Sequence, residues 1–125
     1  MDATDGVEDA VGAAGRIARA TGGVVAVSGP VDVVTDGVHE ARLGNGDALL
    51  TRVTGGGCAL GAVMAAFAGV TADRLAAVVA AVTVYNVAAE VAAARAEGPG
   101  SFAVAFLDAL TGLDADTLRA RAVIS

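Results

Sequence analysis

Lysine and tryptophan are absent from this sequence, and cysteine occurs once among its 125 residues. Without lysine, the chain itself supplies neither a Schiff-base amine nor the lysine of a Walker-type phosphate loop. A single cysteine forms no internal disulfide, and the acidic segment Met1–Glu8 lacks the basic and apolar regions of a secretory signal. Both features predict a reducing, cytoplasmic location.

Positive charge and aromatic side chains are also scarce. The eight basic residues are scattered arginines and the net charge is −6, so the chain has no footprint for a phosphate backbone and nucleic acid is not an expected partner. Hydrophobic residues make up 55% of the chain but aromatic residues only 3%, which excludes a disordered segment and predicts a core of closely packed small side chains. Apolar runs such as Cys58–Val70 are too short to cross a bilayer, so no membrane partner is expected.

The length fits one domain over residues 1–125, and the chain order predicts one helix, then four strands, then further helices. The predicted strands are Val24–Ser28, which reads as buried on both faces, Val31–Thr35, Val38–Leu43 and Leu49–Arg52. The predicted helices are Gly6–Ala20, Cys58–Val70, a long helix capped by Thr71 and running to about Glu97, Phe102–Leu110 capped by Ser101, and a short last helix capped by Asp114. Turn signals at Asp36-Gly37 and Gly44–Asp47 make this part of the sheet antiparallel, so the fold class is half of an α/β layered domain.

The most informative segment is Gly55-Gly56-Gly57-Cys58, where a predicted strand turns into a helix. Three glycines without Cβ atoms let backbone N–H groups converge on an anion, and the helix dipole adds partial positive charge. The segment therefore predicts a phosphate or oxyanion site. A tight corner with no ligand is the competing interpretation.

Cys58 falls in the first turn of that helix, where the dipole favours the thiolate. A packed structural cysteine is the stronger interpretation on composition alone, because free cysteine is among the most buried residue types. Ser28 lies at the carboxyl end of its strand, the edge at which ligands bind in open α/β sheets.

The remaining polar residues form no catalytic or metal-binding pattern. His39 is the only histidine and is predicted on a solvated face, with no residues at metal-ligand spacing, so no metal site is expected. The aspartates look like turn, surface and cap positions. Arg52 either reaches a bound phosphate or, as we favour, has a surface or structural role.

Taken together, five segments resemble the hydroxyethylthiazole kinases of thiamine biosynthesis over the whole chain. The segments are Val24–Gly29, Val31–Gly37, Leu49–Cys58, and Gly98–Phe102 with Phe106–Leu110. The resemblance implies a ribokinase-like fold and transfer of the ATP γ-phosphate to the hydroxyl of 4-methyl-5-(2-hydroxyethyl)thiazole. Most ribokinase relatives end the glycine turn with Asp, whereas the thiazole kinases have Cys, as at Cys58.

The same resemblance implies the site residues. Cys58 takes the catalytic position near the substrate hydroxyl, and Gly55 to Cys58 form the anion hole for the transferred phosphoryl group. Gly55 also contacts the thiazole, and Ser28 stands where the family has a threonine that contacts ATP. The family turn reads Gly-Thr-Gly-Cys, so Gly56 replaces the threonine and adds backbone freedom that lowers affinity or rate.

The resemblance covers only the C-terminal half of the family. The family's other half carries the ligands of Mg²⁺, another arginine that contacts ATP, and part of a thiazole pocket completed in a homo-oligomer, a trimer. Two hypotheses remain open. Either the chain belongs to a thiazole kinase in which Cys58 assists deprotonation of the alcohol, or it is a truncated, non-catalytic fragment that oligomerises or complements an N-terminal half.

Overall fold

The structure is a computed structural model that describes residues 3–125. Its elements along the chain are α1 (Ala3–Thr21), β1 (Val25–Val27), β2 (Asp32–Thr35), β3 (Glu40–Leu43), the 3-10 helix η1 (Ala48–Arg52), α2 (Gly56–Ala68), α3 (Arg74–Ala93), α4 (Pro99–Gly112) and α5 (Ala115–Arg121). The strands form one three-stranded sheet in the order β1-β2-β3. Both strand pairs are antiparallel, which confirms the predicted arrangement of this part of the sheet.

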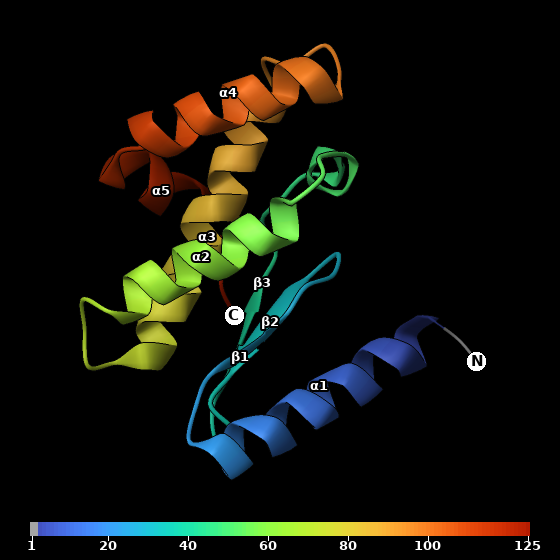
Figure 1. Cartoon of the computed structure of the whole chain (residues 1–125), viewed down its shortest axis with the longest axis vertical. Coiled ribbons are helices and arrows are strands. Elements are labelled where there is room, and N and C mark those ends of the chain that lie inside the picture. Colours follow the sequence, from blue (N-terminus) through green and yellow to red (C-terminus); the bar gives the residue numbers. More distant parts are fainter. Residues whose placement is uncertain (1–2) are drawn as a thin grey trace.

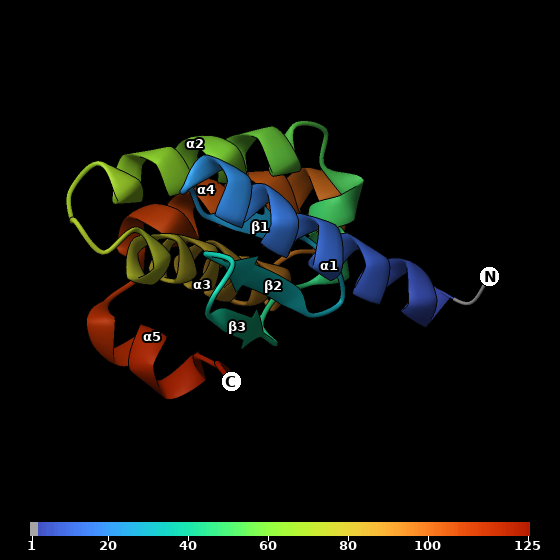
Figure 2. The same ribbon diagram turned by 90° about the horizontal axis from the view of Figure 1, so that it is seen from below.

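Helices cover both faces of the central strand β2. Helix α1 packs on β1 and β2, while α3 packs on β2 and β3 and is itself flanked by α2 and α4 (Figures 1 and 2). Successive side chains of a strand point to opposite faces, so Asp32 and Val34 face α3 while Val33 and Thr35 face α1. All four residues of β2 are buried as a result.

The core forms around α3 from small side chains and a few rings, as the composition predicts. Ala81, Ala88, Ala89 and Ala92 of α3 are fully buried. Tyr85 of the same helix meets the ring of Phe106 edge-on, with centroids 4.8 Å apart, and Phe106 stacks on Phe102. Helix α3 is long and apolar enough to cross a bilayer, but 61% of its apolar window is buried inside this fold, which is the environment of a core helix.

Several predicted boundaries are wrong for local reasons. Leu49–Arg52 is part of η1 instead of a strand, because Asp47 caps the turn by accepting a hydrogen bond from the Leu49 N–H at 2.9 Å. Strand β1 is half-buried instead of buried on both faces, because it lies at an edge of the sheet.

The helix caps also differ from those predicted, with one exception. The long helix starts after Asp73 instead of Thr71, since the Asp73 carboxylate accepts from the Ala76 N–H at 3.0 Å, and it ends at Ala93. Helix α4 starts at Pro99 after Gly98, so Ser101 lies within its first turn instead of at the cap. Asp114 caps α5 as predicted.

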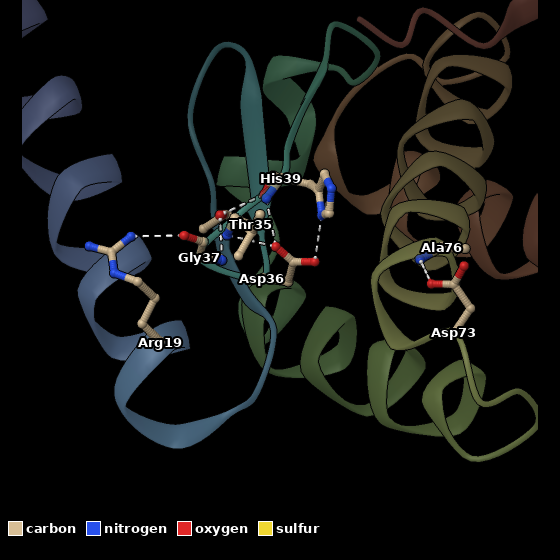
Figure 3. A network of polar contacts seen from close by, with 8 residues as sticks. Arg19, Thr35, Asp36, Gly37, His39, Asp73 and Ala76 are labelled. Carbon is tan, nitrogen blue, oxygen red and sulfur yellow. Dashed lines mark hydrogen bonds and ion pairs between the residues drawn. The ribbon is translucent and has the colours of Figure 1, made fainter.

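The hairpin between β2 and β3 docks on α1 through its tip (Figure 3). Gly37 has a positive φ of +89°, and a Cβ there would lie 2.5 Å from Arg19 Cγ. The Arg19 guanidinium donates to the Gly37 carbonyl at 2.8 Å, and Asp36 accepts from the N–H groups of Val38 and His39. The predicted turn at Asp36-Gly37 is confirmed, and His39 is exposed as expected.

The C-terminal segment Val123–Ser125 pairs with β3, at the edge of the sheet opposite β1. Arg42 and Ser125 exchange two backbone hydrogen bonds of 2.8 and 2.9 Å, and the Gly44 N–H donates to the Val123 carbonyl. The Asn45 side chain forms further hydrogen bonds to the backbone at Arg121 and Val123. Its amide donates to Glu90 and to the Arg121 carbonyl, and its oxygen accepts from the Val123 N–H at 2.7 Å.

Candidate functional site

A cleft of about 610 Å³ opens where β1 ends, β3 ends and α2 begins. One side is the loop after β1 with Ser28, Gly29, Pro30 and Asp32. The other side is η1 with the first turn of α2, and side chains of α3 lie between them. Ser28 directly follows β1 and is exposed, as predicted for a residue at the carboxyl end of a strand.

The glycine segment forms the start of α2. Gly55 is the N-cap residue with φ +85° and ψ +1°, a left-handed conformation that favours glycine. Gly56 is the first helical residue, so Gly57 and Cys58 both lie in the first turn. Within residues 3–125, the N–H groups of Gly57 and Cys58 donate to no protein acceptor. Two free donors at a helix N-terminus are the elements of an anion site.

Gly56 lies in a confined place on the wall of the cleft. A Cβ built there would lie 3.3 Å from the Leu50 carbonyl oxygen and 3.9 Å from the Tyr85 hydroxyl. That hydroxyl donates to the Gly56 carbonyl at 2.6 Å. Burial raises the pKa of Tyr85 above its usual value, so the phenol keeps the proton that it donates. The first turn of α2 is thus held by a side chain of α3.

A second set of polar contacts holds the loop that carries Ser28. The Asp32 carboxylate accepts from the Gly29 N–H at 2.9 Å and from the Asn86 amide at 2.6 Å. Asp32 and Asn86 are only 8% and 3% exposed, so both groups are buried with their partners. Neither residue is predicted from the sequence as part of the site. The available signals were the spacing of Asp32 three residues after Gly29 and a lone asparagine within an apolar helix.

The structure brings only some of the predicted site residues together. Ser28, Gly56 and Gly57 line the same cleft, whereas Gly55 and Cys58 are exposed neighbours of its wall and do not line it. The interpretation of Cys58 as a packed cysteine, which composition alone favours, is wrong, because its side chain is exposed. Arg52 is exposed at the end of η1 and does not line the cleft.

The described residues do not build a metal centre. No group of three or more His, Cys, Asp or Glu side chains with metal-binding geometry occurs within residues 3–125. The cleft holds two carboxylates, and each already has partners: Asp32 accepts from Gly29 and Asn86, and Asp47 accepts from Leu49.

Helices on both faces of an antiparallel sheet, with a glycine-initiated helix opening on a cleft, define an α/β layered protein with a candidate anion site. Residues 1–116 match the model of the hydroxyethylthiazole kinase family, and the chain belongs to that family. The expected fold class and family are thereby confirmed.

Individual relatives give the same result. The chain is 61% identical to the hydroxyethylthiazole kinase of Clavibacter sepedonicus over 110 residues, which is 88% of this chain and 40% of that protein. It is 52% identical to the one of Kineococcus radiotolerans over 120 residues, which is 96% of this chain and 44% of that protein.

A solved structure of hydroxyethylthiazole kinase from Pyrococcus horikoshii superposes with a TM-score of 0.89 at 38% identity, covering 97% of this chain and 47% of that one. The chain thus spans less than half the length of the relatives that it matches.

Proposed function

We propose that this chain provides the nucleotide- and phosphoryl-binding part of a kinase that transfers the γ-phosphate of ATP to the hydroxyl of 4-methyl-5-(2-hydroxyethyl)thiazole in thiamine biosynthesis. The observation that carries the proposal is the start of α2, where the N–H groups of Gly57 and Cys58 donate to no acceptor in the part of the chain that the structure describes and lie beside a cleft that Ser28 lines. Membership of the family supports the choice of reaction and of substrates.

Four of the five predicted site residues have a role in this proposal, whereas Gly56, whose N–H donates to the Val53 carbonyl at 3.4 Å, supplies no donor to the anion hole. The free N–H groups stabilise negative charge on the transferred phosphoryl group, while Gly55 contacts the thiazole and the Ser28 hydroxyl contacts ATP. Cys58 accepts the proton of the substrate hydroxyl, and its exposed side chain is accessible to a substrate. Phosphoryl transfer depends mainly on positioning and electrostatics, so a weak base at this position is sufficient.

Other components of the reaction lie outside this chain in the proposal. The carboxylates in the cleft have partners already, so we assign the ligands of Mg²⁺ to the family's other half and no step to the ion here. We further propose that the active protein is a cytoplasmic homo-oligomer, a trimer, in which a neighbouring copy completes the thiazole pocket.

The test is MgATP-dependent phosphorylation of hydroxyethylthiazole by the purified chain, alone and mixed with the unmatched segment of the Clavibacter sepedonicus enzyme. Gly57→Pro removes one N–H from the first helical turn, where proline is tolerated, and should abolish turnover. Gly57→Ala keeps that N–H and is the matched control. Cys58→Asp, which installs the residue of most ribokinase relatives, should keep activity, and Cys58→Ala should reduce it. An unchanged rate in Gly57→Pro would refute the anion-hole assignment.

The second candidate is a non-catalytic fragment that oligomerises or complements an N-terminal half. Its specific support is that the chain covers only 40% and 44% of the length of the relatives from Clavibacter sepedonicus and Kineococcus radiotolerans. Light scattering with a thermal melt separates the two ideas. A monomer that melts cooperatively would contradict this second candidate, whereas absence of turnover in every mixture, together with a concentration-dependent mass, would favour it.

A further inference from the structure

Two neighbouring residues of α3 contact opposite sides of the cleft. Tyr85 reaches the first turn of α2 through the Gly56 carbonyl, and Asn86 reaches the Ser28 loop through Asp32. The two sides are far apart in sequence, and both neighbours on α3 are almost fully buried. We propose that Tyr85 and Asn86 are positioning residues that fix the two sides of the cleft relative to each other. This inference rests on the proposed function in taking Ser28, Gly57 and Cys58 as the ligand-binding groups.

The contact of Tyr85 sets the direction of an anion-hole donor. The Gly56 carbonyl and the Gly57 N–H belong to one peptide unit, and this unit is planar and trans. When the Tyr85 hydroxyl holds the carbonyl at 2.6 Å, the N–H at the other end must point away from Tyr85. The hydrogen bond also polarises the peptide unit, which strengthens its N–H as a donor. Gly56 and Gly57 have no side chains that could anchor this peptide unit, so the Tyr85 hydroxyl adds a fixed contact from outside α2.

The contact of Asn86 orients a peptide unit on the opposite side of the cleft, in the loop that carries Ser28. The Ser28 carbonyl and the Gly29 N–H form one peptide unit, whose N–H donates to Asp32 at 2.9 Å. Asp32 has a second oxygen facing α3, and Asn86 donates to it at 2.6 Å. The amide therefore fixes the carboxylate, and the carboxylate fixes the peptide unit next to the Ser28 hydroxyl. With Asp32 satisfied by these two donors, its charge is also less available to repel a bound phosphate.

The variants separate positioning from a general loss of stability. Tyr85→Phe keeps the ring packed on Phe106 and removes only the hydroxyl. Asn86→Ala removes the amide. The exchanged pair Asp32→Asn with Asn86→Asp reverses the roles, because the amide introduced on β2 would still accept from Gly29 while donating to the carboxylate introduced on α3. Thr83→Val is the matched control, because it removes a buried hydroxyl of the same helix that bonds only to Val79 and lies outside the cleft.

The first readout needs no ligand. Amide hydrogen exchange of Gly29 is measured against that of Gly22, whose N–H donates to Ala18 in α1. Asn86→Ala should accelerate the exchange of Gly29 by roughly tenfold, the equivalent of one lost hydrogen bond to a charged group. Tyr85→Phe should shift the amide resonance of Gly57, and the exchanged pair should restore the exchange of Gly29. If both single variants match Thr83→Val, the positioning role is wrong.

The second readout is affinity for MgATP, measured by calorimetry in the mixture with the complementing segment. Both single variants should weaken binding by about tenfold, and the exchanged pair should recover it. If the unmutated chain binds no MgATP while the amide signals change as expected, the proposed function fails and the positioning role stands. If the unmutated chain and both variants bind equally, the positioning role fails and the proposed function stands.

Discussion

The three consecutive glycines at the start of α2 differ in what the structure requires of them. Gly55 needs a left-handed backbone, with φ at +85°. Gly56 needs space, because its Cβ would press on the Leu50 carbonyl. Gly57 needs neither, since no described heavy atom beyond its sequence neighbours and the backbone of its own helical turn lies within 4 Å of the place where its Cβ would be. The sequence alone does not distinguish the three glycines. Their different structural requirements follow from the backbone conformation and from the space around each residue.

Alanine at two of these glycines should therefore change stability in opposite directions. Gly55→Ala should lower the free energy of unfolding by about 1 to 2 kcal/mol, the cost of a left-handed L-residue. Gly57→Ala should raise it by up to about 1 kcal/mol, because alanine is the better helix former. Urea denaturation of both variants measures the difference. Equal losses in both would mean that Gly57 is also conformationally constrained.

At the scale of helices and strands, the apolar spacing predicts the helices, whereas short polar signals predict some turns and caps correctly and others wrongly. The apolar spacing located α1 and α2, and Asp36-Gly37 located the hairpin. Two candidate caps lie two residues apart before α3, at Thr71 and Asp73, and only the final backbone geometry selects Asp73. The apolar residues Leu49 and Leu50 suit a strand equally well, but the capping bond from Asp47 favours a 3-10 turn.

The hairpin between β2 and β3 should give the fold part of its acid sensitivity. Hydrogen bonds from the N–H groups of His39 and Val38, and then from the His39 ring, lower the pKa of Asp36 from 3.8 to about 2. A carboxyl group whose pKa is lower in the folded chain stabilises the fold above its unfolded value. This stabilisation is lost as the pH falls from about 4 through about 2.

Asp36→Asn should therefore lose less stability than the unmutated chain between pH 5 and pH 2. Its amide oxygen still accepts from the backbone, and it has no charge to lose. Thermal melts at the two pH values measure the change in Tm for each protein. Asp108→Asn, an exposed site in α4, is the control and should behave like the unmutated chain. A change in Tm that is identical in Asp36→Asn would show that the turn makes no such contribution.

For the whole molecule, the family and the glycine turn beside the cleft can be predicted from the sequence. The two side chains that contact the sides of the cleft, Tyr85 and Asn86, cannot. Tyr85 and Asn86 interrupt the apolar sequence of α3. The spacing of residues along that helix does not indicate which distant segment each of the two side chains contacts. Their partners, Gly56 and Asp32, lie on separate elements that only the packing of α2, α3 and the sheet brings together. Exposure of Cys58 has the same origin, because burial depends on which side of α2 faces α3.

Asn45 makes the C-terminal segment part of the same structure. It links β3 to Glu90 of α3, to Arg121 and to Val123, and it is only 6% exposed. Asn45→Ala should lower the free energy of unfolding by roughly 2 to 4 kcal/mol, because three part-buried hydrogen bonds are lost together.

Urea denaturation checks this loss, and Arg121→Ala provides the comparison. Arg121 is half-exposed and lies 3.9 Å from Glu90, so its removal should cost less than about 1 kcal/mol. Equal losses in the two variants would assign the stabilisation to the ion pair instead of to the amide of Asn45.

Because Val123–Ser125 pairs with β3, the two edges of the sheet differ in how many of their backbone groups are hydrogen-bonded. On the β3 side, the N–H and carbonyl groups of Arg42 and the N–H of Gly44 are already bonded to the chain's own end. On the β1 side, within residues 3–125, the strand pairs with β2 alone. The edge of β3 is therefore occupied by the chain's own end, whereas β1 presents an edge to which a further strand could pair. A strand that extends the sheet from β1, from the same polypeptide or from another, would lie beside Val25–Val27.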